Sequence, residues 1–113
     1  IKIRKFEDKK IKILDLSTKL NKENLPNILK YLNQNKEIKG LDLSSNNLAD
    51  NDLKIIIDFL RTNQTLLTIN LNNNHITNKF MPDLAQVVKE NIVLKEINLQ
   101  NNLLVDQRST FLS

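Results

Sequence analysis

The chain has 113 residues, with 40% hydrophobic and 27% charged side chains, one glycine and no cysteine. This composition fits one globular domain and excludes disulfides, thiolate zinc sites and a thiol nucleophile, which fits a cytoplasmic location. No apolar run is long enough to span a membrane. The net charge of +4 comes from residues 1–12, which hold six basic and two acidic side chains and leave 11 of each for the rest. Because residues 13–113 carry no net charge, the sequence argues against a nucleic-acid-binding domain.

Residues 1–10 are expected to form an N-terminal cap. Ile1 and Ile3 alternate with charged residues, and Glu7-Asp8 is typical of a turn, which predicts an added strand or hairpin. Lysines on such an outer strand would prevent pairing with other chains. The same basic segment leaves an alternative open, in which Phe6 and its neighbouring lysines contact nucleic acid or anionic lipid.

Four segments starting at residues 11, 38, 66 and 94 share one pattern. Their sequences are "IKILDLSTKL", "IKGLDLSSNNL", "LLTINLNNNHI" and "LKEINLQNNLL", with spacings of 27, 28 and 28 residues. The apolar residues in each segment lie two apart, which predicts a short strand with one buried face. They form two columns: Leu14, Leu41, Ile69, Ile97 and Leu16, Leu43, Leu71, Leu99.

A helical pattern follows each of the first three segments. Apolar residues recur at positions i, i+3, i+4 and i+7, which places them on one face of a helix. Pro26 and Pro82 lie near the expected helix starts, and the N-cap residue of the second helix is expected to be Asp50 or Asn51. Residues 105–112 are expected to form a short final helix. The predicted stripes are Leu25, Ile28, Leu29, Leu32; Leu53, Ile56, Ile57, Leu60; and Met81, Leu84, Ala85, Val88, with Thr77 or Asn78 capping the third helix.

One strand with one helix cannot bury its own apolar face, so such units stack and share a core. The sequence therefore predicts a single α/β domain over residues 1–113. This domain is a short right-handed solenoid with parallel strands on the concave side and helices on the convex side. The fourth repeat, from residue 94, is partial, and Ile1 in place of methionine fits a piece of a longer protein.

The segments "LDLSSNNL", "INLNNNHI" and "INLQNNLL", each preceding a helix or the last residues, resemble leucine-rich repeats of the ribonuclease-inhibitor-like class over residues 11–113. The resemblance implies that one asparagine of each strand-to-turn segment faces inward and bonds neighbouring turns. Lys19 replaces it in the first repeat, where one residue is also missing, so that turn is expected to be irregular. The implied structural column is Asn46, Asn74 and Asn102.

Strand positions between the apolar columns are expected to face the concave side, which related solenoids commonly use for partners. This surface is polar and lacks the Trp, Tyr and Arg side chains that dominate interfaces, so a modest affinity is expected. The other interpretation is that these are solvated strand residues. The candidate partner-binding residues are Asp15, Ser17, Asp42, Ser44, Thr68, Asn70, Asn72, Glu96, Asn98 and Gln100, with Ile13 and Gly40 beside them.

Catalytic and cofactor sites lack their usual residues. Asp15 and Asp42 are expected side by side, where a cation or a basic partner could bind, but two exposed aspartates are the simpler interpretation. His75 is the only histidine, and Gly40 alone cannot form a phosphate-binding glycine motif. The sequence therefore predicts no enzyme activity and no cofactor, metal, or small-molecule ligand.

The leading hypothesis is a protein-interaction module that binds another protein through the concave face. Lysine, asparagine and isoleucine make up 45 of the 113 residues, and repeats with this bias resemble effectors that bacteria deliver into host cells. Location would then be the cytoplasm or, for an effector, the host cell. Two alternatives remain: an adaptor for nucleic acid or an anionic membrane through residues 1–12, and a recruiting fragment of a larger regulatory enzyme.

Overall fold

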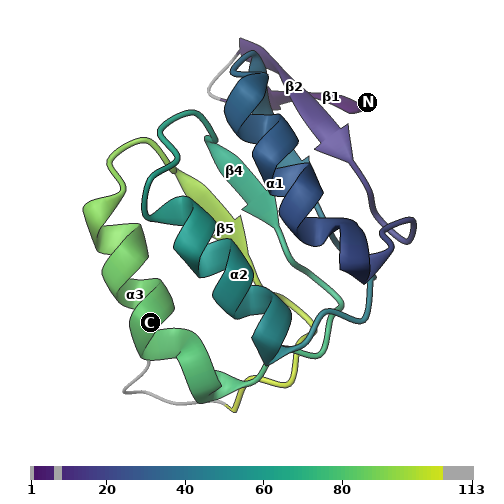
Figure 1. Ribbon diagram of the computed structural model, residues 1–113, viewed down its shortest axis with the longest axis vertical. Helices are drawn as coiled ribbons and strands as arrows, with labels where there is room; N and C mark the ends of the chain where they lie inside the picture. The colour runs from purple at the N-terminus through teal and green to yellow at the C-terminus, as the bar shows by residue number, and fades with distance from the viewer. Residues whose placement is uncertain (1, 7–8, 106–113) are drawn as a thin grey trace.

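The computed structural model describes residues 2–6 and 9–105, with side chains from residue 11 onward. Its helices are α1 (Leu25–Gln34), α2 (Asp50–Leu60) and α3 (Met81–Glu90), and short 3-10 helices η1 (Lys22–Asn24) and η2 (Asn78–Phe80) precede α1 and α3. The strands form one sheet in chain order (Figure 1). They are β1 (Lys2–Phe6), β2 (Lys9–Asp15), β3 (Ile38–Asp42), β4 (Thr68–Asn70) and β5 (Glu96–Asn98).

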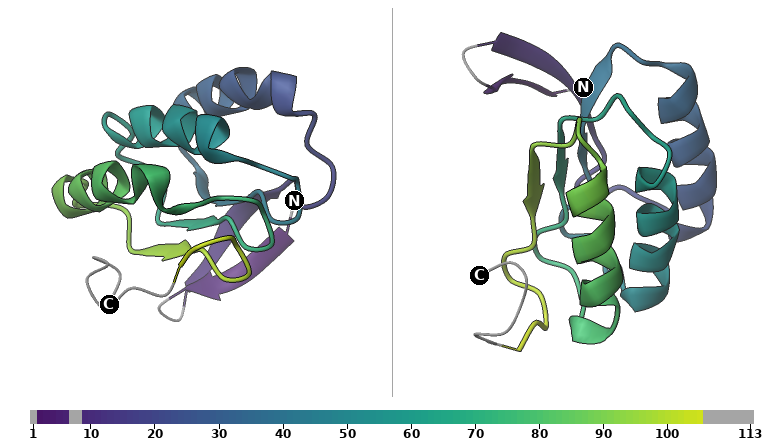
Figure 2. Two further views of the ribbon diagram at one scale, coloured as in Figure 1. Left: turned by 90° about the horizontal axis from the view of Figure 1, so that it is seen from below. Right: turned by 90° about the vertical axis from the view of Figure 1, so that its left-hand side faces the viewer.

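Strands β2 to β5 are parallel, and each pairs with the equivalent strand of the next coil. The helices form one layer and the strands the other, as the view along the layers shows (Figure 2). Leu41 pairs with Leu14 on one side and with Ile69 on the other, so the predicted columns lie side by side. The predicted α/β solenoid, with parallel strands on one side and helices on the other, is confirmed.

A strand precedes the first repeat, as the alternation of residues 1–6 predicts. β1 pairs antiparallel with β2, with Lys2 opposite Ile13 and Phe6 opposite Lys9. The parallel sheet therefore has a hairpin at its N-terminal edge. The helix expected over residues 105–112 lies outside the described residues, apart from Val105, which is not helical.

The core lies between the two layers and consists of the predicted columns. Leu43 and Leu71 are 0% exposed, and α1 and α2 bury the predicted stripes, with Ile28 half-buried. Helix α3 differs, because Val87 is buried while Val88 is only half-buried. Among the described residues no helix packs on the outer side of α3, so the face it buries is turned toward α2.

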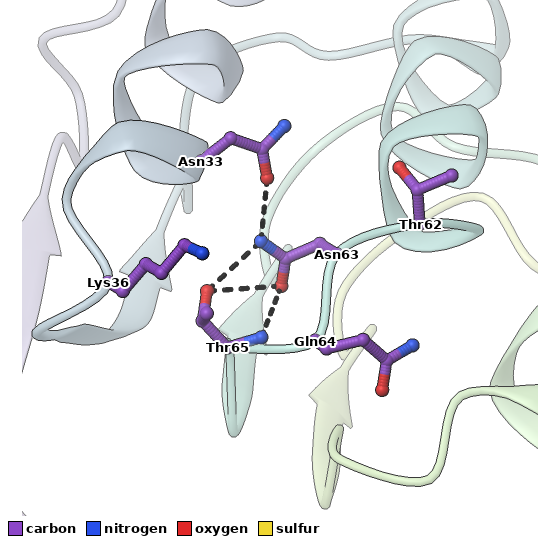
Figure 3. Close-up of a pocket in the computed structure, with 6 residues that line it drawn as sticks. All are labelled: Asn33, Lys36, Thr62, Asn63, Gln64 and Thr65. Carbon is purple, nitrogen blue, oxygen red and sulfur yellow. Dashed lines mark hydrogen bonds between the residues drawn. The ribbon is translucent and has the colours of Figure 1, made fainter.

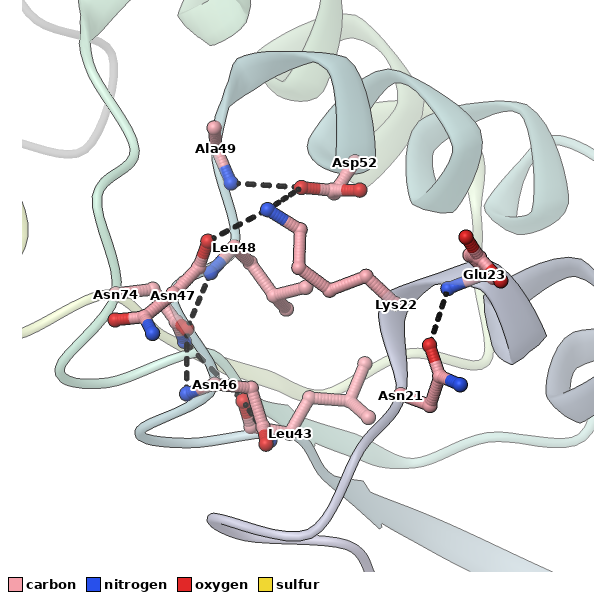
Figure 4. A network of polar contacts seen from close by, with 10 residues as sticks. All are labelled: Asn21, Lys22, Glu23, Leu43, Asn46, Asn47, Leu48, Ala49, Asp52 and Asn74. Carbon is pink, nitrogen blue, oxygen red and sulfur yellow. Dashed lines mark hydrogen bonds and ion pairs between the residues drawn. The ribbon is translucent and has the colours of Figure 1, made fainter.

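The start of α2 differs from the prediction. Ala49, and neither Asp50 nor Asn51, is the N-cap residue. The carboxylate of Asp52 accepts the N–H of Ala49 at 2.9 Å, and the Lys22 ammonium lies 3.3 Å from the same carboxylate (Figure 4). A carboxylate in the first helical turn is stabilised by the unbonded N–H groups there. The capping group thus comes from inside the helix.

Asp50 instead joins the second coil to the third. Its carboxylate accepts the N–H of Thr77 at 2.8 Å and the Thr77 hydroxyl at 2.6 Å. The same hydroxyl oxygen accepts the N–H of Lys79 and caps η2. Thr77 is therefore a cap residue, as predicted. It caps the 3-10 helix η2, which leads into α3, and not α3 itself.

The first turn contains a strained residue. Thr18 has φ 61°, and the equivalent Ser45, Asn73 and Asn101 each have φ 59°. Asparagine tolerates this left-handed region, whereas a β-branched residue is a genuine outlier there. The first turn shares this left-handed residue with the other turns, but it is one residue shorter and its Lys19 N–H bonds the Leu16 carbonyl at 3.1 Å, so it is irregular as expected.

Replacing Thr18 by asparagine is expected to raise the free energy of unfolding by about 1 kcal/mol, because the strain of the β-branched side chain is removed. Urea denaturation followed by circular dichroism measures the change. Thr62→Asn is the matched control, since Thr62 is exposed and is not among the positive-φ residues. Equal effects of the two substitutions would contradict the strain at Thr18.

Candidate protein-binding face

The candidate residues lie in three rows that cross the strands on the side opposite the helices. The middle row contains Asp15, Asp42, Asn70 and Asn98, which pair in register along the sheet. Neighbouring strands are about 4.8 Å apart, so each side chain is next to its counterparts. The structure therefore brings the predicted set together on one face. The outer rows are Ile13, Gly40, Thr68, Glu96 and Ser17, Ser44, Asn72, Gln100.

The first three members of the middle row are held in place by a hydrogen bond that recurs from coil to coil. The Asp42 carboxylate accepts the N–H of Ser44 at 3.0 Å and its hydroxyl at 2.6 Å. Asp15 accepts the same two groups of Ser17 at 3.0 and 2.7 Å. In the third coil the Asn70 side-chain oxygen accepts the N–H two residues later at 2.9 Å. Each side chain ends its strand with a short local turn, which fixes its direction.

This geometry corrects the view of the row as simply solvated. Asp42 is 8% exposed and Thr68 only 2%, while Asp15 and Asn70 are half-buried. Residues in the middle of a row are flanked by a strand on each side, which removes most of their contact with water. The hydroxyls of Ser17 and Ser44 donate directly to the carboxylates of Asp15 and Asp42.

Gly40 lies where the face is most tightly packed. A Cβ atom at this position would lie 2.7 Å from Cγ1 of Ile13 and 3.0 Å from Cγ2 of Thr68. Only glycine fits between these side chains without a shift. Thr68 in turn donates its hydroxyl to the Glu96 carboxylate of the next strand at 2.7 Å. The outer row that contains Gly40 is thus close-packed around this glycine and carries a carboxylate at its other end.

The asparagines implied by the resemblance form a bonded column between the turns. Asn74 is 3% exposed, and its side-chain oxygen accepts the N–H groups of Asn46 and Leu48 at 3.0 and 2.9 Å (Figure 4). Its amide group donates to three carbonyl oxygens at 3.0 to 3.2 Å. Asn46 and Asn102 also donate to three carbonyl oxygens each, and each accepts one N–H group, that of Leu20 and that of Ile76. The column satisfies backbone groups that would otherwise be buried without partners.

A second asparagine column lies at the opposite end of the strands. Asn63 and Asn91 are 3% and 6% exposed, and each side-chain oxygen accepts the N–H groups two and three residues later at 3.0 Å. The amide group of each reaches the preceding coil. The recurrence of Asn35, Asn63 and Asn91 after each helix was visible in the sequence, but their bonding was not predicted.

A polar hollow of about 390 Å³ lies beside this column (Figure 3). Three of its side chains bond one another: Asn63 donates to the Asn33 oxygen at 2.9 Å and to the Thr65 hydroxyl at 3.0 Å. These groups are therefore part of the turn structure. The hollow is lined by Asn33, Lys36, Thr62, Asn63, Gln64 and Thr65.

Clustered metal ligands and long apolar helices would point to other kinds of site. Within residues 2–6 and 9–105, no group of three or more His, Cys, Asp or Glu side chains is arranged to hold a metal ion. His75 is exposed in its turn, next to Ile76, which is fully buried. None of the described helices has the length and apolar character needed to cross a membrane.

Solved structures that resemble this chain include one domain of leiomodin and one of tropomodulin. One is Leiomodin-1 Actin-Binding Site 2, with 24% sequence identity, a TM-score of 0.72 and a match over 80% of this chain and 53% of that one. The other is the tropomodulin C-terminal domain of Caenorhabditis elegans, with 17% identity, a TM-score of 0.70 and a match over 81% and 56%. The chain spans about half the length of these structures. At such identities the likeness shows the fold, a short solenoid of strands and helices.

No protein-family model and no curated protein matches the chain. The resemblance to the ribonuclease-inhibitor-like class and to bacterial effectors was wrong, because these structural neighbours are the leiomodin and tropomodulin domains. The physical reason is that the strand pattern and the inward asparagine specify how a coil closes. Any solenoid built from such coils needs this strand pattern and this asparagine, so the two features do not distinguish one class of solenoid from another.

Proposed function

We propose that the chain is a protein-interaction module whose partner contacts the concave strand face. The observation that carries the proposal is the row Asp15, Asp42, Asn70 and Asn98, three of whose members are fixed in direction by hydrogen bonds within their own turns. Side chains held in one direction lose little entropy when a partner binds. Together with Glu96 the face carries three carboxylates, which suits a partner with basic or amide donors.

The fold neighbours suggest the first partner to test. The leiomodin structure is an actin-binding site of that protein, so actin is the first candidate for this chain. The present face has no aromatic side chain in its three rows, so we expect a dissociation constant in the micromolar range, about −8 kcal/mol or weaker. Purified actin, as monomer and as filament, is therefore the probe.

The concave variant Asp15→Asn, Asp42→Asn, Glu96→Gln is expected to bind actin at least about tenfold more weakly than the unchanged chain. It removes three charges from the face but keeps an oxygen that accepts the serine and threonine bonds. Fluorescence anisotropy measures binding to the monomer, and co-sedimentation measures binding to filaments. Capture from a cell lysate with both variants identifies another partner if actin does not bind.

The matched control is Asp58→Asn, Asp83→Asn, Glu90→Gln, which makes the same charge change on exposed residues of α2 and α3. Binding that both variants weaken equally would contradict a role for the concave face. Binding that falls steeply with salt and is lost when residues 1–10 are removed would instead support the basic segment as an adaptor for an anionic surface.

A further inference from the structure

One position in the repeat joins the start of a helix to the next coil. Asp50 accepts the Thr77 N–H at 2.8 Å, and the Asn78 side-chain oxygen accepts the Val105 N–H at 2.8 Å. Asp50 and Asn78 are equivalent residues of successive repeats, and each bonds an N–H group 27 residues further along the chain. The second and third coils thus use the same joint, in which a side-chain oxygen accepts a backbone N–H of the following coil.

The first coil has a lysine at this position and cannot form the same joint. Lys22 is the residue equivalent to Asp50, but an ammonium group only donates hydrogen bonds. The N–H equivalent to that of Thr77 belongs to Ala49, and the Asp52 carboxylate of the same coil accepts it at 2.9 Å. The Lys22 ammonium lies 3.3 Å from this carboxylate and donates to a carbonyl oxygen of the second coil at 2.9 Å (Figure 4). A charged pair therefore replaces the direct bond.

Water and dissolved ions reach this pair. The Lys22 side chain is 42% exposed and the Asp52 side chain 14% exposed. The attraction between two charges in such a position weakens when salt screens them. The joints made by Asp50 and Asn78 depend less on salt, because their N–H partners carry no charge. Of the three joints, the first is therefore the one that salt should loosen.

The inward asparagine column also gives the first coil less support than the second. The Asn74 side-chain oxygen accepts two N–H groups of the second coil. Among the described residues, Asn46 accepts only one N–H group of the first coil, that of Leu20. Lys19, which takes the place of the inward asparagine in the first coil, is exposed. Loss of the charged pair therefore acts on the interface that has fewer such bonds to compensate for it.

We propose that Lys22 and Asp52 form an ionic latch that couples the first coil to the second. With the latch closed, the first coil stays in register with the rest of the sheet, and Asp15 lies beside Asp42. With the latch open, the first coil separates locally from the second more often, which breaks the middle row between these two residues. Ionic strength thereby regulates the concave face, and this consequence alone rests on the proposed function.

Hydrogen exchange, followed by nuclear magnetic resonance of the ¹⁵N-labelled chain, tests the latch directly. The amides of Leu16, Thr18 and Leu20 donate to the second coil, so their exchange reports the opening of the first joint. An increase of sodium chloride from about 0.1 to about 1 M should speed this exchange about fivefold. The reference is the equivalent set of amides that donates to the third coil and should change by less than about twofold: Leu43, Ser45 and Leu48.

Two substitutions of Lys22 separate the latch from other effects of salt. Lys22→Met keeps an apolar stem without the charge, so the first-coil amides should exchange about fivefold faster at low salt and should no longer respond to salt. Lys22→Asn introduces the side chain that the third coil has at Asn78, so exchange should stay slow at both salt concentrations. The matched control is Lys30→Met, on an exposed position of α1, which should behave as the unchanged chain.

Exchange of the first-coil amides that does not respond to salt would overturn the latch. A salt response that persists in Lys22→Met would also overturn it, because other charges would then be responsible. Equal acceleration of both sets of amides in Lys22→Met would show a general loss of stability and not the opening of one joint. The exchange is measured without a partner, so a failure of actin to bind leaves this test unaffected, and a failure of the latch leaves the proposed function standing.

Discussion

Replacing Asn74 by leucine is expected to lower the free energy of unfolding by about 4 kcal/mol. Leucine has the same number and branching of side-chain heavy atoms as asparagine, so the substitution removes hydrogen bonds without leaving a cavity. The N–H groups of Asn46 and Leu48 lose their acceptor inside the protein, at about 1 to 3 kcal/mol each. Urea denaturation followed by circular dichroism measures the change.

Substitutions of two other asparagines serve as comparisons for Asn74→Leu. Asn102→Leu, in the half-buried last described turn, should cost about 1 to 2 kcal/mol, because among the described residues only the N–H of Ile76 donates to the Asn102 side chain. Asn51→Leu, exposed on α2, should change stability by less than about 0.5 kcal/mol. Equal losses at Asn74 and Asn51 would show that the column does not hold the coils together.

Truncating Leu71 to alanine is the second large expected effect, a loss of about 3 to 5 kcal/mol. The side chain is 0% exposed in the column between the sheet and the helices, so its removal takes away buried area and leaves a cavity. Domains of this size have a total stability of about 5 to 15 kcal/mol, so the midpoint of denaturation should fall strongly. The same denaturation experiment gives both the midpoint and its slope.

Exposed and half-buried leucines are the controls for Leu71. Leu103, 57% exposed, should lose less than about 0.5 kcal/mol on truncation to alanine. Leu16, half-buried in the first coil, should give an intermediate loss. A loss at Leu16 as large as at Leu71 would mean that both side chains are equally well covered. That result would contradict the structure, in which Leu16 is half-buried and Leu71 is fully buried.

The repeat itself could be predicted from the sequence. Residues two apart in a strand and three or four apart in a helix fall on one face by local geometry alone. The columns of Leu41 and Leu43, and the helix stripe from Leu53 to Leu60, therefore lie where they were expected. The rows of the candidate face follow from the same register, because a fixed spacing places equivalent residues side by side.

The environment of those residues could not be predicted in the same way. Asp42 and Thr68 alternate correctly with the core, yet they are nearly buried, because burial depends on what the neighbouring strands place beside them. Asp50 has the composition of an N-cap residue but bonds Thr77 of the next coil, which lies 27 residues further along the chain. Such contacts depend on the stacking distance between coils, which has no signal within one repeat.

The period, the buried columns and the kind of coil can be read from the sequence, since each follows from which face of a strand or helix a residue occupies. Which polar groups bond across coils depends instead on how the coils stack, as the bond between Asp50 and Thr77 shows. Hydrophobic periodicity lies in residues that are close in the chain, whereas the bond between Asn46 and Asn74 requires two atoms 28 residues apart to meet within 3.0 Å.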